Sequence, residues 1–199
     1  MKEYIDINDE IYNKYYTILN DIEKFYYSEF WENRFKRRCR EENIEFDEIE
    51  LDCLLGAITM LKERVNLKQF VETNQYNGVS NKSLMIAINS NIVEKDLYNT
   101  LMHEFGHLQY FLKDFETIIE LNSKILNSPS PLCLESKKDD EYFSNENEIR
   151  QRIIPIVKEM YNKKWSSQDA YNRSQQLKSN DLYEIYSKEQ IIYWLDNIL

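Results

Sequence analysis

The chain contains few residues that interrupt helices and strands or that form disulfides. Three glycines, three prolines and three cysteines occur among its 199 residues. Such low glycine and proline contents argue against a chain of many tight turns and against a flexible-linker character. The cysteines (Cys39, Cys53 and Cys133) are odd in number and widely spaced. We therefore expect reduced thiols in a cytoplasmic protein, and neither a disulfide frame nor a cysteine zinc site.

Long apolar runs are absent as well. No stretch approaches the roughly 18 uninterrupted apolar residues of a membrane-spanning helix, and residues 1–10 lack the apolar segment of a secretory signal. The formal net charge of −10 disfavours binding to a phosphate backbone. These features predict an intracellular chain that binds neither membranes nor nucleic acid, and they leave its oligomeric state open.

Apolar residues that recur every three or four positions predict several helices. We expect Asn8 to cap the first helix, and Asn91 with Glu94 to form a capping box before the third. Ser187 and Gln190 form a similar box near the end of the chain, and Pro155 should kink or restart the helix that contains it. The predicted helices cover residues 8–42, 47–65, 92–114, a segment from about 146, and the C-terminal segment.

Two strands are expected between the second and third helices. They cover residues 67–74 and 83–90 and are separated by an Asn77-Gly78 turn signal. The prediction is one mostly helical α+β domain over residues 1–199. Its parts would be N-terminal helices (1–65), a core (66–163) and C-terminal helices (164–199).

Histidine is the scarcest informative residue. Both histidines of the chain, His103 and His107, lie in the segment "LMHEFGHLQYF" at 101–111. Residues four apart share one face of a helix, so the two imidazoles should project together. They would lie opposite an apolar stripe formed by Leu97, Leu101, Phe105, Leu108, Leu112 and Phe115.

This spacing suits a zinc ion. Two imidazoles one helical turn apart can chelate Zn²⁺, and Glu104 directly follows the first of them, which is the H-E-x-x-H arrangement. Zinc lowers the pKa of a bound water towards about 7, and Glu104 would act as general base for attack on a carbonyl carbon. The motif also arises by chance, so two structural histidines held by hydrogen bonds remain an alternative.

The segment "MIAINSNIVEKDLYNTLMHEFGHLQYF" resembles the strand-then-helix core of the gluzincin-like zincin metallopeptidases. It is especially similar to the small HExxH proteins of phages and mobile elements, including the prophage ImmA/IrrE type that cuts repressors. The resemblance covers about 70 residues, from the strand at 83 to near 154, and Gln109 departs from it. It implies a minimal zincin core, with a small antiparallel sheet and an edge strand beside the metal helix. It also implies Zn²⁺-dependent hydrolysis of an intracellular protein or peptide.

The resemblance also guides the choice of a third ligand. Tyr110 and Lys113 stand where the metzincin pattern needs glycine and histidine, so that branch is excluded. Gluzincin-like members take a glutamate from a later helix, and Glu148 in "EIRQR" (148–152) fits their E-x-x-A-R-like pattern best. Glu148 also forms a capping box with Asn145, which leaves Glu146 as an alternative ligand. More distant alternatives are Glu116, Glu120, Glu135 and Glu141.

In zincins an edge strand beside the metal helix binds an extended peptide by β-augmentation. The resemblance therefore implies substrate contacts at Ile86, Ala87 and Ile88, unless this strand is internal with both edges paired. A donor for the transition state is also expected, and nothing in the sequence selects one of Tyr142, Tyr161, Arg150 and Arg152.

A function of another class remains open. Segments rich in tyrosine and tryptophan, such as "KFYYSEFWENRF" and "IIYWLDNIL", are typical of packed helices and also of protein interfaces. The alternative is a non-catalytic or virion-associated binding protein on a zincin-like scaffold, in which the metal is structural or absent.

Overall fold

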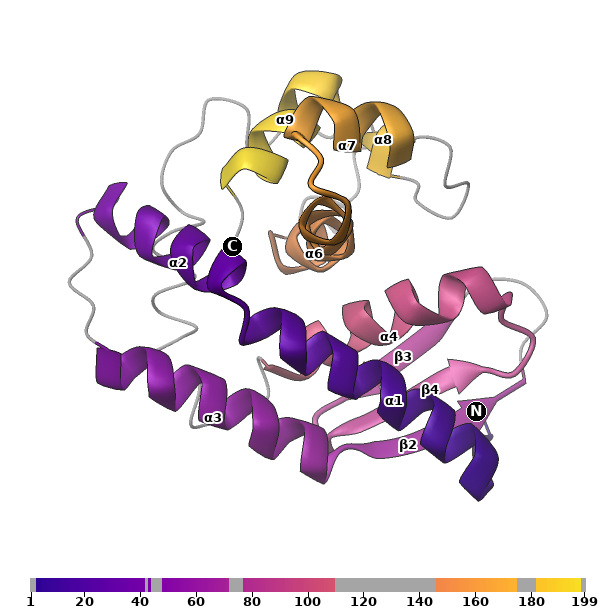
Figure 1. Ribbon diagram of the computed structural model, residues 1–199. Coiled ribbons are helices and arrows are strands. Elements are labelled where there is room, and N and C mark those ends of the chain that lie inside the picture. Colours follow the sequence, from indigo (N-terminus) through magenta and orange to yellow (C-terminus); the bar gives the residue numbers. More distant parts are fainter. Residues whose placement is uncertain are drawn as a thin grey trace. The chain divides into compact units, whose positions relative to one another are not determined.

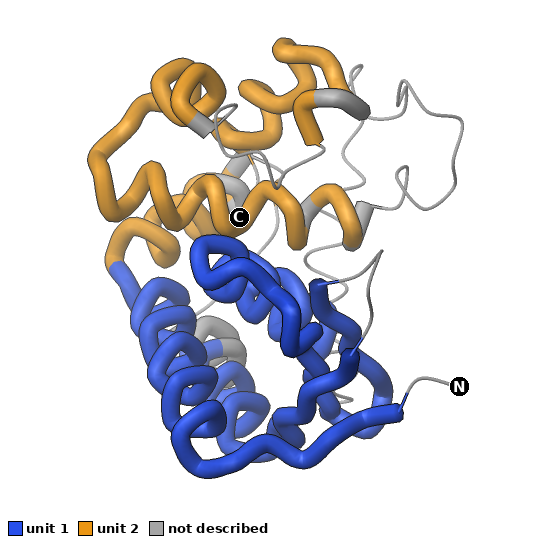
Figure 2. The backbone as a smooth tube through the Cα atoms, turned by 90° about the vertical axis from the view of Figure 1, so that its right-hand side faces the viewer, with its two compact units in different colours: residues 1–28, 46–120 blue, residues 29–45, 121–199 orange. Residues whose placement is uncertain are grey.

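The computed structural model describes residues 3–41, 43, 48–71, 77–109, 146–174 and 182–197. It is mostly helical, with one small sheet, so the predicted α+β class is confirmed (Figure 1). The chain divides into two compact units (Figure 2). Residues 1–28 and 46–120 form the first unit, and residues 29–45 and 121–199 form the second. That the whole chain is one domain stays a prediction.

The predicted helix over 8–42 is wrong as a single element. Helix α1 runs from Asp9 to Tyr26, and α2 from Glu29 to Glu41. The chain turns between them because the backbone N–H and the hydroxyl of Ser28 both donate to the carbonyl of Phe25. The start of α1 is as predicted, since the Asn8 side chain accepts a hydrogen bond of 2.9 Å from the N–H of Ile11.

In the first unit, α1 packs against α3 (Glu48–Arg64), which matches the predicted helix over 47–65. A largely buried ionic cluster joins the two helices: Lys62 donates to Glu23 at 2.5 Å, and the Thr59 hydroxyl donates to the same carboxylate at 2.7 Å. Burial by itself would raise the pKa of Glu23, but these hydrogen bonds outweigh it and lower that pKa. The cluster therefore ties α1 to α3 through a charged carboxylate.

The sheet of the first unit has four strands in the order β1-β2-β4-β3. They are β1 (Tyr4–Asp6), β2 (Asn66–Phe70), β3 (Gly78–Asn81) and β4 (Met85–Asn89). The expectation of an antiparallel sheet is wrong, since β2 and β4 run parallel while β1–β2 and β3–β4 are antiparallel. The difference arises from β3, a segment that was expected to be a turn. Because it forms a strand, the chain reverses direction twice between β2 and β4, and these two strands run parallel.

The expected edge strand is an internal one. β4 pairs with β2 on one side and with β3 on the other, and all five of its residues are buried. The tight turn lies at residues 82–84, where Leu84 has a positive φ of 54°. Gly78 belongs to β3, so the Asn77-Gly78 pair marks the start of a strand. The edge next to β4 is therefore β3.

Helix α4 (Glu94–Leu108) covers β3 and β4 and also contacts α1 (Figure 1). Leu97, Leu101, Phe105 and Leu108 are buried, as predicted; Leu112 and Phe115 lie outside the described residues. The predicted capping box is wrong. The helix begins two residues later than an Asn91 cap would require. Its N-cap is Val93, whose side chain makes no capping hydrogen bond.

The second unit contains α2 and four helices from the C-terminal part: α6 (Glu146–Lys163), α7 (Ser167–Ser174), α8 (Leu182–Ile185) and α9 (Lys188–Asn197). α6 runs through Pro155 as one helix and does not restart there. Arg34 and Arg37 of α2 donate to the carbonyls of Leu195 and Asp196 at the end of α9. The Ser187–Gln190 capping box is confirmed by reciprocal hydrogen bonds.

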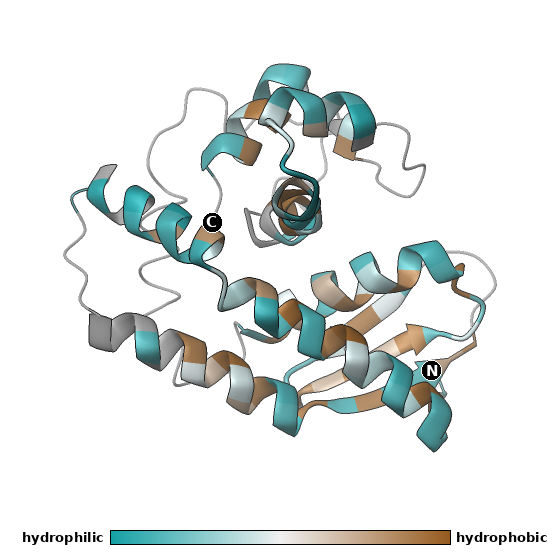
Figure 3. Cartoon of the chain, viewed as in Figure 1, coloured by the Kyte–Doolittle hydropathy of each residue, from teal (hydrophilic) through white to brown (hydrophobic). Residues whose placement is uncertain are grey.

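Hydropathy follows these elements closely. Apolar residues dominate β4, whereas α2 is hydrophilic along most of its length (Figure 3). Within the described part of the chain, none of the helices combines the length and the apolar character that crossing a membrane requires.

Candidate metal centre

The two histidines of the chain lie side by side on α4. Their Nε2 atoms are 2.9 Å apart and share a hydrogen bond, and the ring planes are nearly perpendicular at 85°. Both side chains are half-buried. The opposite face of α4 is fixed by Leu101, Phe105 and Leu108 in the core of the first unit, so the helix cannot turn the imidazoles inward without losing that packing.

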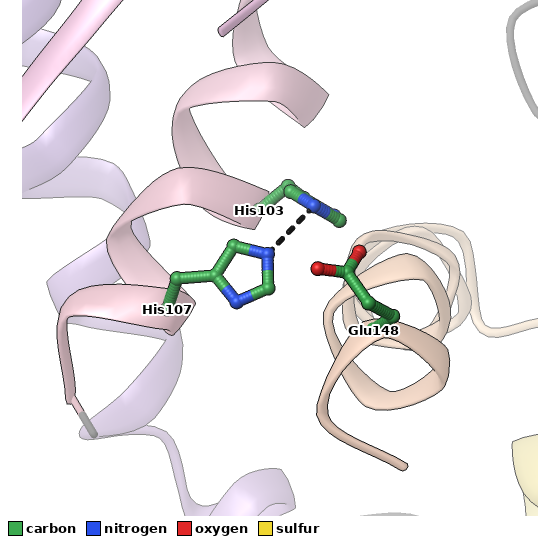
Figure 4. A group of neighbouring side chains, drawn as sticks. All are labelled: His103, His107 and Glu148. Carbon is green, nitrogen blue, oxygen red and sulfur yellow. Dashed lines mark hydrogen bonds between the residues drawn. The ribbon is translucent and has the colours of Figure 1, made fainter. Parts of the chain in front are cut away.

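Glu148 contributes a third possible ligand from α6. One ligand atom from each of His103, His107 and Glu148 can be chosen so that all three lie within 4.8 Å of one another (Figure 4). Among the side chains that the structure describes, no other group of histidine, cysteine, aspartate or glutamate meets this condition. The three residues form a group able to hold a metal ion, and they are the three that the sequence analysis selected.

The donor set fits zinc. Two imidazole nitrogens and one carboxylate oxygen are ligands that catalytic zinc sites use, with a fourth position left for water or substrate. A tetrahedral zinc ion at about 2.0–2.1 Å from each nitrogen would place them about 3.3 Å apart. The observed 2.9 Å is slightly shorter, so a small rotation of either ring is enough to open the pair.

Glu104 lies beside the histidines on the face of α4 that meets β3. Its side chain is 8% exposed, and its carboxylate accepts a hydrogen bond of 2.7 Å from the Ser80 hydroxyl. Gly78, two residues earlier on β3, leaves the room: a Cβ there would lie 2.8 Å from Cγ of Glu104 and 2.7 Å from Cγ2 of Thr100. Glu104, the predicted base, therefore lies in the contact between α4 and β3.

Gly78 and Ser80 are parts of this site that the sequence did not lead us to expect. Gly78 was interpreted as a turn residue, and Ser80 carried no motif. The sequence carries one indication of this contact: small residues occupy the alternate positions 78 and 80 in a segment next to a predicted strand, which is typical of a strand that another element approaches closely.

The residues predicted to contact the substrate do not form an exposed surface, so that prediction is wrong. Ile86, Ala87 and Ile88 are each 0% exposed, and their strand is paired on both sides. A peptide cannot add to this strand because its backbone groups already bond to β2 and β3.

Two of the four residues considered as transition-state donors, Tyr161 and Arg152, have described side chains. Tyr161 packs its ring 5.3 Å from that of Phe30, which indicates a structural role. Arg152 is half-buried on α6, four residues after Glu148. The structure does not describe Tyr142 or the side chain of Arg150. It also does not describe the alternative ligands and the residue of the predicted capping box, which are Glu116, Glu120, Glu135, Glu141, Asn145 and the side chain of Glu146.

Comparison with known proteins adds no family assignment. No protein-family model, no curated protein and no solved structure matches this chain.

Proposed function

We propose that this chain is a zinc-dependent peptidase that hydrolyses an intracellular protein, similar to the zincins of the ImmA/IrrE type. The observation that carries the proposal is the convergence of His103, His107 and Glu148, with Glu104 next in sequence to the first ligand. A chance H-E-x-x-H motif requires neither a third acidic ligand nor a buried glutamate beside the histidines.

The chemistry divides among these residues. His103, His107 and Glu148 would hold the zinc ion, which when bound would supply Lewis-acid activation of water and of the peptide carbonyl. Glu104 takes one proton from the attacking water and delivers it to the nitrogen of the leaving amine. The C–O bond forms first, and the C–N bond breaks once the nitrogen has received the proton, so one water is consumed for each peptide bond cleaved.

The substrate would bind at β3. This strand is an edge of the described sheet, lies against α4 and pairs with β4 only through one side of its backbone. An extended peptide adding to β3 would gain backbone hydrogen bonds and pass the end of the Glu104 side chain. This replaces β4 as the proposed substrate strand.

Two measurements test the proposal. Metal content by plasma mass spectrometry should give about one zinc per chain for wild type, none for His103→Ala, and less for Glu148→Ala. Glu146→Ala and Glu159→Ala, acids on the same helix, should keep their zinc. A proteome-derived peptide library should then be cleaved by wild type, and not by Glu104→Gln that retains zinc. Full cleavage by Glu104→Gln would refute the assigned base.

A second candidate is a non-catalytic binding protein on the same scaffold. The hydrogen bond between the two Nε2 atoms favours it, because each imidazole satisfies the other without a metal. Wild type that takes up no zinc when it is supplied, or that binds zinc and cleaves no library peptide, would support this candidate over the peptidase.

A further inference from the structure

Two residues of β3 face the helix that carries the proposed base. Gly78 and Ser80 are two apart in a strand, so they lie on the same face of the sheet, and that face meets α4. On α4, Thr100 and Glu104 are four apart and share the helix face that meets Gly78. The contact is therefore a two-by-two arrangement, with Gly78 opposite Thr100 and Glu104, and Ser80 opposite the Glu104 carboxylate.

The chemistry of this contact is unusual for a helix packed on a sheet. Such an interface is normally filled by apolar side chains, and burial of a carboxylate costs free energy unless hydrogen bonds compensate. Ser80 supplies such a bond to one oxygen, Oε2, at 2.7 Å. Because a serine donates one proton, the second oxygen keeps its capacity to accept a proton from another group.

Glycine at position 78 controls how close the strand comes. No glycine of the chain that the structure describes has a positive φ, so the backbone conformation does not demand glycine here. The demand is steric, since a methyl group would lie under 3.0 Å from both Thr100 and Glu104. β3 can approach α4 closely enough for the Ser80 bond because position 78 has no side chain.

We propose that Ser80 is a positioning residue for the peptidase reaction, and that Gly78 makes its contact with Glu104 possible. The inference rests on the proposed function, in which Glu104 is the general base. Ser80 fixes the Glu104 side chain through Oε2, and Gly78 lies against Oε1, so the carboxylate keeps one orientation for proton transfer. Without the bond the carboxylate samples other rotamers, and the proton transfer slows while substrate binding and zinc binding persist.

The kinetic test uses the library peptide that wild type cleaves best. Ser80→Ala should lower kcat about tenfold to a hundredfold, with KM and zinc content unchanged. Ser80→Thr retains the hydroxyl and should recover most of that loss. Ser83→Ala is the matched control, because Ser83 is exposed on the adjacent turn, and it should behave as wild type. A purely structural role for Ser80 would instead lower the active fraction and leave kcat per zinc-loaded active chain unchanged.

A double-mutant cycle tests the contact without any activity. In urea unfolding of the metal-free protein, Ser80→Ala should lower the unfolding free energy by an amount equivalent to about tenfold in the equilibrium constant. The same substitution should have almost no effect in a Glu104→Ala background. Additive effects would show that the two side chains do not interact, and would overturn the inference.

The failures of the two proposals can be told apart. Zinc-loaded wild type that cleaves nothing overturns the peptidase and, with it, the catalytic purpose of Ser80. Active wild type together with a Ser80→Ala variant of unchanged kcat overturns the positioning role alone.

Discussion

The Nε2 atoms of His103 and His107 lie 2.9 Å apart and share a hydrogen bond. Both imidazoles already project from the same face of α4, so chelation of one ion needs only a small change in ring orientation and costs little rotamer entropy. The same bond holds the pair together without a metal. The site is therefore preorganised, and its stability in the two states can be compared directly.

We expect zinc to stabilise the wild-type protein against heat. A free zinc concentration one hundred times Kd would add about 2.7 kcal/mol to the unfolding free energy. For a chain of this size that corresponds to a rise of roughly 5–10 °C in melting temperature. Differential scanning fluorimetry with zinc and then with excess EDTA measures the rise and its reversal. His107→Ala should show neither, and an equal response in that variant would place the zinc elsewhere.

Gly78→Ala should destabilise the protein by about 1–3 kcal/mol, because the added methyl group overpacks the contact with α4. Thr100→Ala removes the nearest atom, so the double variant Gly78→Ala/Thr100→Ala should unfold later in urea than the sum of the single effects predicts. Library-peptide cleavage should stay low in the double variant, since the clash with Cγ of Glu104 remains. A fully active Gly78→Ala variant would show that this close approach is not needed.

Ile86→Ala separates the original substrate interpretation from the observed core position. Ile86 is fully buried in β4, so the substitution should cost about 2–5 kcal/mol of stability by leaving a cavity. The folded fraction should keep the KM of wild type for the library peptide. Lys82→Ala, on the exposed turn before this strand, is the control for stability. A changed KM with wild-type stability would return this strand to the substrate site.

Stability at acidic pH should depend on Glu23. Its pKa in the folded protein is lowered from the ordinary value of 4.5, because the bonds from Lys62 and Thr59 outweigh burial. A depressed pKa gives stability that is present above the unfolded value and lost as the pH falls through the folded value. Urea titrations from pH 6 to pH 3 should therefore show a steeper loss below about pH 4.5 for wild type than for Glu23→Gln.

Glu63→Gln serves as the control for that titration, because Glu63 is an exposed acid on the same helix as Lys62. It should follow the wild-type curve. Identical curves for wild type and Glu23→Gln would mean that other groups govern the acid response.

Features of the site that depend on near neighbours in the sequence were predictable. The pairing of His103 with His107 follows from helical spacing, as do the buried positions of Leu101 and Phe105 on the other side of α4. The cap at Asn8 and the box at Ser187 and Gln190 also formed as expected. In these cases the interacting groups lie within four residues, so the local chain conformation brings them together.

Contacts between distant segments were predicted less well. The parallel pairing of β2 with β4, the internal place of β4 and the role of β3 as its neighbour all differ from expectation. A short apolar strand has the same sequence pattern at the edge and in the centre of a sheet. The pattern indicates which faces are buried, but it does not indicate which strands pair with it. Glu148 was selected through a resemblance to a family, and no periodicity within the chain singled it out.

The sequence by itself determined the mostly helical class, the histidine pair and the identity of the proposed base, because each follows from residue type and helical spacing. Only the tertiary structure decided what surrounds that base. Ser80 and Gly78 lie 24 and 26 residues before Glu104 in the sequence, and they meet it through the packing of β3 on α4. Such a meeting depends on strand order and on steric fit between elements, and neither is encoded in the spacing of residues along one helix or one strand.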